Sequence, residues 1–265
     1  MIVERAEEID AGLLTRRFIH PYSAPTVVLF HGLTATPRQY DALAPMLFAR
    51  GSNVLVPRLP GHGHRDRLTD ALAQLEVAEL IAAVKLTLRD ARDLGQPVTV
   101  AGFSLGGLLA AYVAQREEVK RAVCIAPFFG VRWLPQDLLV RMPSMFLWWN
   151  PLLRARHGSD GYPRYPISAV RKAFVLGAAI LEDALVRAPL TPEIVLVTNP
   201  YELTCHNGLV HELAERWRAR GAAVAERELA VLGPSHDFVT PRRDSRRRAR
   251  MRERVYPALV EAIVA

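Results

Sequence analysis

A serine that could act as a nucleophile stands at the centre of a Gly-x-Ser-x-Gly pattern at residues 102–106. The apolar run at residues 97–101 predicts a short buried strand, and residues 108–114 predict a helix because they are rich in strong helix formers. A serine hydroxyl is a poor nucleophile unless it is held exposed beside a base, which a sharp turn from strand to helix can do. The flanking glycines let strand and helix approach without a Cβ clash. The pattern therefore predicts Ser104 as a nucleophile.

The base that such a serine needs is predicted to be His236. Histidine is the side chain whose pKa suits proton transfer near neutral pH, and the chain contains eight of them. His236 follows the last predicted strand, residues 222–229, so it can reach back over the edge of the sheet. His31, His62 and His64 follow early strands instead. We expect structural hydrogen bonds for the pair His62 and His64, because no third metal ligand accompanies it at a sensible spacing.

A carboxylate must orient the base, and Glu202 is the predicted acid. It is the single carboxylate in the loop at residues 199–207, and it produces the chain order serine, acid, histidine that this motif uses. An exposed loop charge is the alternative role for Glu202. Asp237 adjoins the predicted base in sequence, and neighbouring side chains of an extended loop point apart, so it would orient that base poorly. Asp183 and Glu193 are the fallback acids.

Acyl transfer also needs hydrogen-bond donors for the oxyanion of the tetrahedral intermediate. The backbone N–H of Leu105 is one candidate, because it begins the helix that follows Ser104. The second donor should come from a loop after an early strand, and the sequence His-Gly-Leu at residues 31–33 fits that position. The N–H groups of Leu33 and Leu105 are therefore the predicted oxyanion hole.

The elements that must position these groups alternate between strands and helices. Unbroken apolar or β-branched runs, such as residues 26–30, predict strands that are buried on both faces. The predicted strands cover residues 26–30, 52–57, 97–101, 121–126, 193–198 and 222–229, and the predicted helices cover residues 38–49, 69–94, 108–114 and 208–220. Such alternation implies right-handed βαβ crossovers. We therefore predict an α/β fold with a mostly parallel sheet and helices on both of its faces.

Residues 127–189 interrupt this alternation with three of the four tryptophans and several prolines. We interpret them as a mainly helical inserted cap, or lid, over the sheet edge, with residues 1–126 and 190–265 forming the core. Aromatic side chains of an insertion need a surface to pack against, either on the core alone or also above an apolar substrate cleft. The candidate substrate-binding residues are Trp133, Phe146, Trp148 and Trp149.

The net charge of +7 is concentrated near the end of the chain. Eight arginines and two acidic residues lie from Arg242 to Arg254, which accounts for all but one unit of that charge. Apolar residues recur at four-residue intervals from Met251 to Ile263, which predicts a terminal helix with a buried stripe and a solvated arginine face, kinked or restarted at Pro257. An anionic partner is the alternative role for the arginines. Nucleic acid is not expected, because no aromatic residues are interleaved for base stacking.

The length of 265 residues and an apolar fraction of 50% fit one large α/β domain. No uninterrupted apolar run reaches about 18 residues, so no transmembrane helix is expected. Residues 1–8 are acidic and lack the apolar core of a signal peptide. Cys124 and Cys205 have apolar, strand-like surroundings, which favours reduced thiols over a disulfide framework. We therefore expect a cytoplasmic protein.

Four motifs, in this order, make the chain resemble the α/β-hydrolase superfamily over essentially its full length. They are Phe-His-Gly-Leu-Thr at 30–34, Pro-Arg-Leu-Pro-Gly-His-Gly at 57–63, Gly-Phe-Ser-Leu-Gly-Gly at 102–107 and Pro-Ser-His-Asp at 234–237. Within the superfamily the chain is similar to the branch of carboxylesterases, monoacylglycerol lipases and lysophospholipase-like enzymes. The resemblance implies that Ser104 is the nucleophile and His236 the base. It also implies Leu33 and Leu105 as oxyanion donors and Glu202 as the acid, where the family more often has aspartate.

These observations predict a serine hydrolase that cleaves a carboxylic ester or thioester through an acyl-enzyme intermediate. The expected partner is a small-molecule ester with an apolar acyl group, and no cofactor or metal is expected. The same groups could also cleave amides, peptides or C–C bonds, because fold and triad do not determine the substrate. A catalytically silent binding protein that keeps the fold is the alternative of another class.

Overall fold

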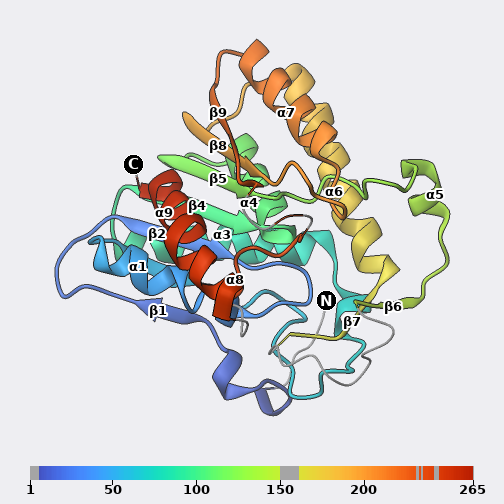
Figure 1. Cartoon of the computed structure of the whole chain (residues 1–265), viewed down its shortest axis with the longest axis horizontal. Helices are drawn as coiled ribbons and strands as arrows, with labels where there is room; N and C mark the ends of the chain where they lie inside the picture. Colours follow the sequence, from blue (N-terminus) through green and yellow to red (C-terminus); the bar gives the residue numbers. More distant parts are fainter. Residues whose placement is uncertain (1–5, 150–160, 231–232, 234, 242–244, 265) are drawn as a thin grey trace.

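The computed structural model describes residues 6–149, 161–230, 233, 235–241 and 245–264, and within them seven strands form the central sheet (Figure 1). The strands are β1 (Arg16–Phe18), β2 (Thr26–Phe30), β3 (Asn53–Val56), β4 (Val98–Phe103), β5 (Arg121–Ile125), β8 (Glu193–Thr198) and β9 (Ala223–Glu228). Their order is β1-β3-β2-β4-β5-β8-β9, and all neighbours are parallel except β1 and β3. The six predicted strands and the mostly parallel sheet are confirmed.

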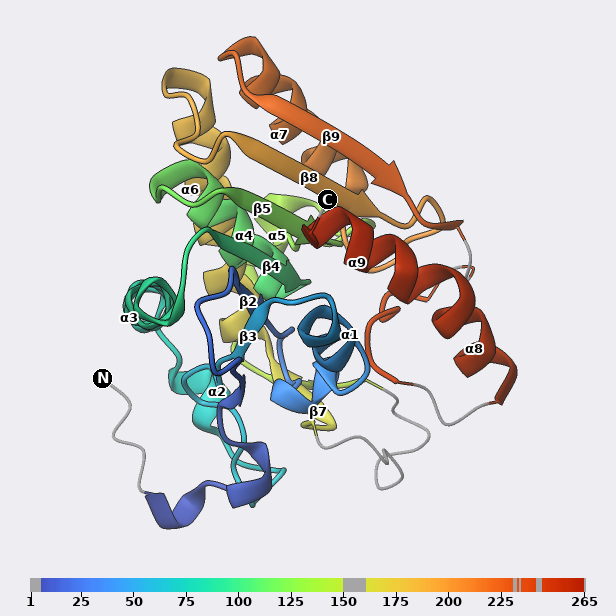
Figure 2. The same ribbon diagram turned by 90° about the vertical axis from the view of Figure 1, so that its left-hand side faces the viewer.

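Helices cover both faces of the sheet, with α3 on one side and α1 and α9 on the other (Figure 2). The first face carries α3 (Val77–Leu94), α4 (Leu105–Arg116), α6 (Ile167–Val186) and α7 (Asn207–Ala219). The second carries α1 (Leu43–Ala49) and α9 (Tyr256–Val264). Strands β2 and β4 are buried at every residue, because helices from both layers pack on them. The loops after β2 and β4 are therefore held on a rigid support.

Two predicted helices are divided in the structure. Residues 38–49 form a short 3-10 helix, Pro37–Tyr40, and then α1. Residues 69–94 form α2 (Ala71–Gln74) and then α3. The second division has a local cause, because Glu76 and Glu79 build a capping box, in which the backbone N–H of Glu76 donates to the Glu79 carboxylate over 3.1 Å. The antiparallel edge strand β1 was not predicted, because its three residues are too few for a recognisable alternation.

The arginine-rich end forms α8 (Ser245–Arg250), a π-helical turn (Met251–Val255) and α9. Pro257 is the second residue of α9, and the widened turn lies directly before it because proline has no N–H for the preceding turn. The predicted buried apolar stripe is confirmed. The helix does not restart at Pro257 but widens into a π-helical turn before it, with helical dihedrals at Arg250 and Tyr256. Residues 242–244 at the start of this segment lie outside the described residues. Among the described residues, none of the helices is both long and apolar enough to cross a membrane.

The segment between β5 and β8 begins with α5 (Gln136–Arg141) and an antiparallel ribbon of β6 (Phe146–Trp148) and β7 (Arg164–Pro166). The ribbon was not predicted from the sequence. It is held by pairing of Leu147 with Tyr165 and by contact between the rings of Trp149 and Tyr165. The following helix α6 packs on α4 and α7 in the helical layer of the sheet. Residues 150–160 of the predicted cap lie outside the described residues.

Candidate active site

Ser104 occupies a strained turn between β4 and α4. Its φ of 56° and ψ of −112° are unusual for a residue with a side chain, and its N–H donates to the carbonyl of Ile125 over 2.9 Å. Both glycines of the pattern are sterically required. A Cβ on Gly102 would lie 2.0 Å from the carbonyl oxygen of Gly106, and a Cβ on Gly106 would lie 1.8 Å from the carbonyl oxygen of Phe30. The turn that holds the serine therefore requires a residue without a side chain at both positions.

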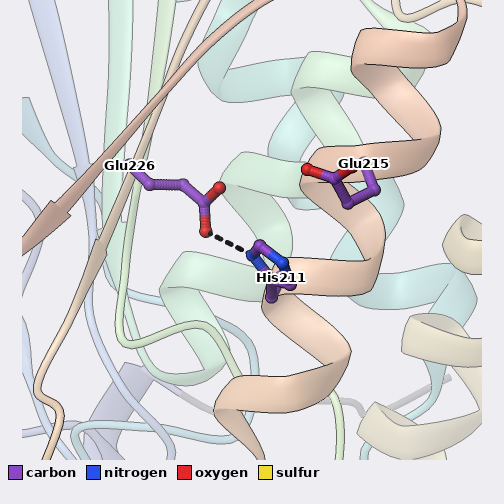
Figure 3. A group of neighbouring side chains, drawn as sticks. All are labelled: His211, Glu215 and Glu226. Carbon is purple, nitrogen blue, oxygen red and sulfur yellow. Dashed lines mark hydrogen bonds and ion pairs between the residues drawn. The ribbon is translucent and has the colours of Figure 1, made fainter.

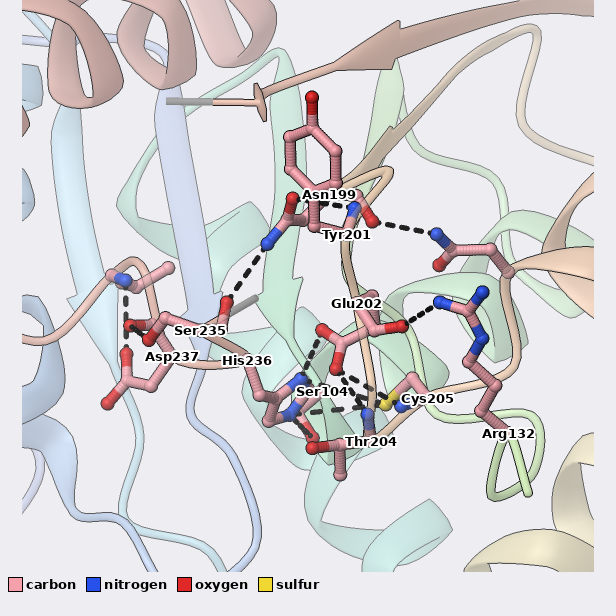
Figure 4. A network of polar contacts seen from close by, with 12 residues as sticks. Ser104, Arg132, Asn199, Tyr201, Glu202, Thr204, Cys205, Ser235, His236 and Asp237 are labelled. Carbon is pink, nitrogen blue, oxygen red and sulfur yellow. Dashed lines mark hydrogen bonds and ion pairs between the residues drawn. The ribbon is translucent and has the colours of Figure 1, made fainter. Parts of the chain in front are cut away.

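Three side chains predicted from distant parts of the chain meet in one line of hydrogen bonds (Figure 4). The Oγ atom of Ser104 lies 2.9 Å from Nε2 of His236, and Nδ1 of His236 lies 2.7 Å from Oε2 of Glu202. Glu202 follows β8 and His236 follows β9, so neighbouring parallel strands deliver both loops to the same sheet edge as the serine. The arrangement can pass the serine proton to Nε2 while the carboxylate holds Nδ1–H.

The carboxylate of Glu202 is fully buried, which contradicts the alternative of an exposed loop charge. Its Oε1 accepts hydrogen bonds from the backbone N–H of Thr204 over 2.6 Å and of Cys205 over 3.3 Å. The guanidinium of Arg132 holds the same loop by donating to the carbonyl oxygen of Glu202. Burial by itself raises the pKa of Glu202, but the bonds from His236 and from the two N–H groups outweigh it and lower the pKa. Glu202 is therefore an anion beside the imidazole.

The imidazole of His236 is mostly buried, and the Cys205 thiol lies against it, 3.8 Å from Nδ1 and 4.0 Å from Nε2. Burial lowers the pKa of His236, whereas the contacts with Cys205 and Glu202 raise it and prevail, so the pKa lies well above its ordinary value. The ring also packs on Phe103, with the ring centroids 4.9 Å apart. These contacts hold the ring in the plane between carboxylate and hydroxyl.

The other acids considered from the sequence are engaged elsewhere. Asp237 turns away from the imidazole, and its Oδ1 accepts from the N–H groups of Val239 and Thr240 over 3.1 and 3.0 Å (Figure 4). Asp183 pairs with Arg116 and Arg187 on the helical layer. Glu193 pairs with Arg121 over 2.5 Å. The structure therefore brings Glu202, and none of these three, to His236.

The two predicted oxyanion donors both line the space above Ser104. Among the described residues, neither the N–H of Leu33 nor that of Leu105 has a hydrogen-bond acceptor. The loop before Leu33 is held firmly, because the N–H of Gly32 donates to Oε1 of Gln39 over 2.8 Å. Two unoccupied N–H groups beside a serine hydroxyl can receive an oxyanion.

His31 also supports this loop, and its tautomer follows from its partners. Its Nε2 accepts from the N–H of Leu59 over 3.2 Å, so Nδ1 carries the proton and donates to the carbonyl of Gly32 over 3.0 Å. Burial, and then the neighbouring His62, lower the pKa of His31 well below its ordinary value, so the ring is neutral. His62 bonds through Nδ1 to the carbonyl of Pro60 over 2.9 Å, as expected for a structural histidine.

An open cavity of about 740 Å³ lies above Ser104 and His236. Of the four candidate substrate-binding aromatics, Trp149 lines it and donates from Nε1 to Oγ1 of Thr34 over 2.8 Å. The other three are not among its lining residues. Trp133 is 71% exposed and stacks on Arg132, and Phe146 packs under Arg164. For Trp133, Phe146 and Trp148 the substrate-binding prediction is therefore not supported, because none of the three lines the cavity.

Further lining side chains were not found from the sequence. They include Gln39, Phe128, Val131, Tyr162, Tyr165, Val170, Ala173 and Thr240. A weak signal exists for Gln39 and Thr240, because each lies a few residues from a recognised motif. The others come from the segment after β5 and from α6, where no local pattern marks a wall residue. The cavity thus combines motif loops with residues that only the fold brings together.

Comparison with known proteins decides the family. The sequence model that defines the alpha/beta hydrolase family matches residues 27–262. The chain belongs to this family. A thermostable monoacylglycerol lipase of Bacillus sp. (strain H-257) is 32% identical over 89 residues, 34% of this chain and 34% of that protein. A pimeloyl-[acyl-carrier protein] methyl ester esterase of Aromatoleum aromaticum is 36% identical over 112 residues, 41% of this chain and 40% of that protein.

These two matches to curated relatives therefore span well under half of each relative's length. A solved monoacylglycerol lipase of Paleococcus ferrophilus superposes over 94% of this α/β hydrolase and 99% of that chain, with a TM-score of 0.65 and 19% sequence identity. At that identity the likeness concerns the fold. The predicted α/β-hydrolase fold is confirmed by the family match and by this superposition.

A second group of polar side chains lies away from the cavity of this α/β hydrolase, on α7 and β9 (Figure 3). His211, Glu215 and Glu226 have ligand atoms within 4.8 Å of one another, and all three are exposed. Arg218 occupies both carboxylates, at 2.8 Å from Glu215 and 2.6 Å from Glu226. The group is therefore an ion-pair network on the surface, whose cation is the guanidinium.

Proposed function

We propose that this α/β hydrolase is a serine hydrolase of carboxylic esters, with Ser104, His236 and Glu202 as its catalytic triad. The observation that carries the proposal is the line of hydrogen bonds from Ser104 through His236 to Glu202, at 2.9 and 2.7 Å, beneath an open cavity. The names of its partial relatives, a monoacylglycerol lipase and a methyl ester esterase, support ester bonds as the target.

The reaction begins when Oγ of Ser104 attacks the ester carbonyl carbon and Nε2 of His236 takes the hydroxyl proton. The carbonyl oxygen becomes an oxyanion, which the N–H groups of Leu33 and Leu105 stabilise. The tetrahedral intermediate collapses, the C–O bond to the alcohol breaks, and Nε2–H returns the proton to the leaving oxygen. Glu202 stabilises the imidazolium that exists between these two proton transfers.

Water completes the cycle by attacking the acyl-enzyme. His236 takes a proton from the water, a second oxyanion forms, and the Ser104–acyl bond breaks as Nε2–H reprotonates Oγ. The net change is one ester and one water to one acid and one alcohol. No cofactor is needed for any of these transfers.

An apolar acyl group is the second part of the proposal. Leu33, Phe128, Val131, Tyr165 and Val170 line one wall of the cavity and belong to one hydrophobic cluster. Burying an acyl chain against them removes apolar surface from water, which is favourable in proportion to the area buried. We assign residues 127–189, which contribute most of this wall, as a cap on a core of residues 1–126 and 190–265, with α6 anchoring the cap in the helical layer of the sheet. Two free, buried cysteines support a reducing compartment, and we propose the cytoplasm.

The direct test compares the wild-type protein with Ser104→Ala on p-nitrophenyl esters and with a fluorophosphonate probe. We expect ester hydrolysis and covalent labelling of the wild type and neither for the variant, because the probe reacts with an activated serine. Equal hydrolysis by both proteins would contradict the assignment. Labelling without cleavage of any ester, but with cleavage of amides or C–C bonds, would favour the alternative hydrolases, and absence of labelling would favour a silent binding protein.

A further inference from the structure

The cavity above Ser104 is lined by two chemically different groups of side chains, which we call its apolar and polar ends. The apolar wall described above forms one of them. The other is polar and is lined by Arg38, Gln39, Asp41, Asp237 and Thr240. A substrate that fills both ends must itself combine an apolar and a polar part.

The polar end contains a pair of side chains with unused donors. Gln39 is only 6% exposed, its Oε1 accepts from the N–H of Gly32 over 2.8 Å, and its Nε2 donates to Oγ1 of Thr240 over 3.2 Å. An amide nitrogen has two hydrogens and a hydroxyl has one. Among the described residues, the second hydrogen of Gln39 Nε2 and the hydroxyl hydrogen of Thr240 have no acceptor. Together they present two donors at the cavity wall.

The charged groups of this end are already engaged by partners. Arg38 pairs with Asp41 over 3.3 Å, and Arg16 also pairs with Asp41. The carboxylate of Asp237 accepts two backbone N–H groups. The polar end therefore offers neutral donors, while its cation Arg38 is already paired with a carboxylate. An anion would be desolvated there without a counter-charge, so an uncharged acceptor oxygen suits this end better.

The chemistry of the proposed reaction decides which part of the ester faces this end. The leaving oxygen must receive its proton from Nε2 of His236, so the alcohol lies on the histidine side of the tetrahedral carbon. Asp237 and Thr240 of the polar end lie one and four residues after His236 in the chain. The apolar end then receives the acyl chain, and the polar end receives the alcohol.

We propose that Gln39 and Thr240 form a leaving-group subsite that selects esters whose alcohol carries a second, neutral acceptor oxygen near the ester oxygen. This inference rests on the proposed ester hydrolysis and adds the chemical class of the alcohol, such as a hydroxyalkyl or alkoxyalkyl group. The acceptor oxygen takes the two unused donors in place of water. The balance of the reaction is unchanged, since one water still yields one acid and one alcohol.

The test uses esters of one acid and pairs of alcohols matched in heavy atoms. We compare kcat/KM for methoxyethyl butanoate with butyl butanoate, and for hydroxyethyl butanoate with propyl butanoate. The intrinsic reactivity of each ester is the same for every variant, so a change of the ratio between variants reports the subsite. Thr240→Val removes the hydroxyl at nearly constant volume, and Thr240→Ser is the matched control that keeps it.

We expect Thr240→Val to lower the oxygenated-to-alkyl ratio about five-fold, the size expected for one neutral hydrogen bond, and Thr240→Ser to keep it. The ratio for the methoxyethyl ester must fall as much as the ratio for the hydroxyethyl ester, because the site supplies donors and the alcohol needs only an acceptor oxygen. A ratio in Thr240→Val equal to that of the wild type overturns the subsite while ester hydrolysis stands. Failure of the wild type to cleave any of the four esters overturns the proposed function itself.

A second measurement needs no variant. The wild-type acyl-enzyme is formed from p-nitrophenyl butanoate and partitioned between water and added methoxyethanol or butanol. Because the attacking alcohol occupies the leaving-group subsite in reverse, we expect several-fold more ester product from methoxyethanol than from butanol. A preference for butanol contradicts the subsite.

Discussion

Nδ1 of His236 lies 2.7 Å from Oε2 of Glu202, although the two residues are 34 positions apart in the chain. They belong to loops that follow the neighbouring strands β9 and β8. The other oxygen of the carboxylate is bound by the backbone N–H groups of Thr204 and Cys205. A buried carboxylate with both oxygens engaged cannot rotate freely, so it holds the imidazole in one orientation and one tautomer.

Replacing Glu202 with Gln should lower kcat by about a thousand-fold or more, because loss of the anion leaves the imidazole in the wrong tautomer and its cationic form unstabilised. Rates on p-nitrophenyl butanoate measure the effect. Asp183→Asn is the matched control, since that carboxylate pairs with Arg116 and Arg187 away from the cavity, and its kcat should stay within about two-fold of wild type. A near-normal rate for Glu202→Gln would remove Glu202 from the triad.

The pH dependence of kcat/KM should report the raised pKa of His236. The base must be neutral, so activity is absent below this pKa and appears as the pH rises through it. Contacts with Cys205 and Glu202 raise the pKa well above its ordinary value, so the limb of the wild-type profile should lie above about pH 6.5. In Glu202→Gln the negative charge is gone, the pKa falls, and the limb should move toward acid. If the activity of both proteins rises at the same pH, Glu202 is not the cause of the raised pKa of His236.

Gly106→Ala should destabilise the fold, because its Cβ would lie 1.8 Å from the carbonyl oxygen of Phe30 in the rigid β2 strand. We expect a loss of about 3 kcal/mol or more in the free energy of unfolding and a fall in Tm of about 10 °C, measured by circular dichroism. Gly12→Ala is the control, since its Cβ would meet only the Asp10 side chain at 3.3 Å. Equal Tm values for both variants would contradict the steric role of Gly106.

Trp149→Ala should weaken the hydrolysis of esters with long acyl chains. Trp149 lines the cavity and is fastened to Thr34 over 2.8 Å, so its removal takes apolar surface from the wall. We expect kcat/KM for p-nitrophenyl octanoate to fall about ten-fold, with a smaller change for the acetate. Trp133→Ala serves as the comparison, because Trp133 is 71% exposed and does not line the cavity. Equal effects of both substitutions would show that the wall has been assigned wrongly.

Much of the fold and of the candidate site could be predicted from the amino-acid sequence. The glycine on each side of Ser104 predicts a tight turn. Residues without Cβ are needed there because strand and helix approach each other closely around the serine. The buried apolar runs predicted the parallel strands, and the parallel strands placed the loops of Glu202 and His236 at one edge of the sheet. Periodicity failed where segments are short, as for β1 and the β6–β7 ribbon.

The sequence by itself determined the fold, the nucleophile turn and the candidate base, because each depends on local backbone requirements and on hydrophobic runs. The tertiary structure alone decided which carboxylate reaches His236 and which side chains line the cavity. The sequence ranked Glu202 above Asp183, Glu193 and Asp237 by its loop position, but only the structure shows that Glu202, of these four, has its carboxylate within hydrogen-bond distance of the imidazole. Distances between loops and the direction of a tryptophan depend on packing among segments far apart in the chain, which no local pattern encodes.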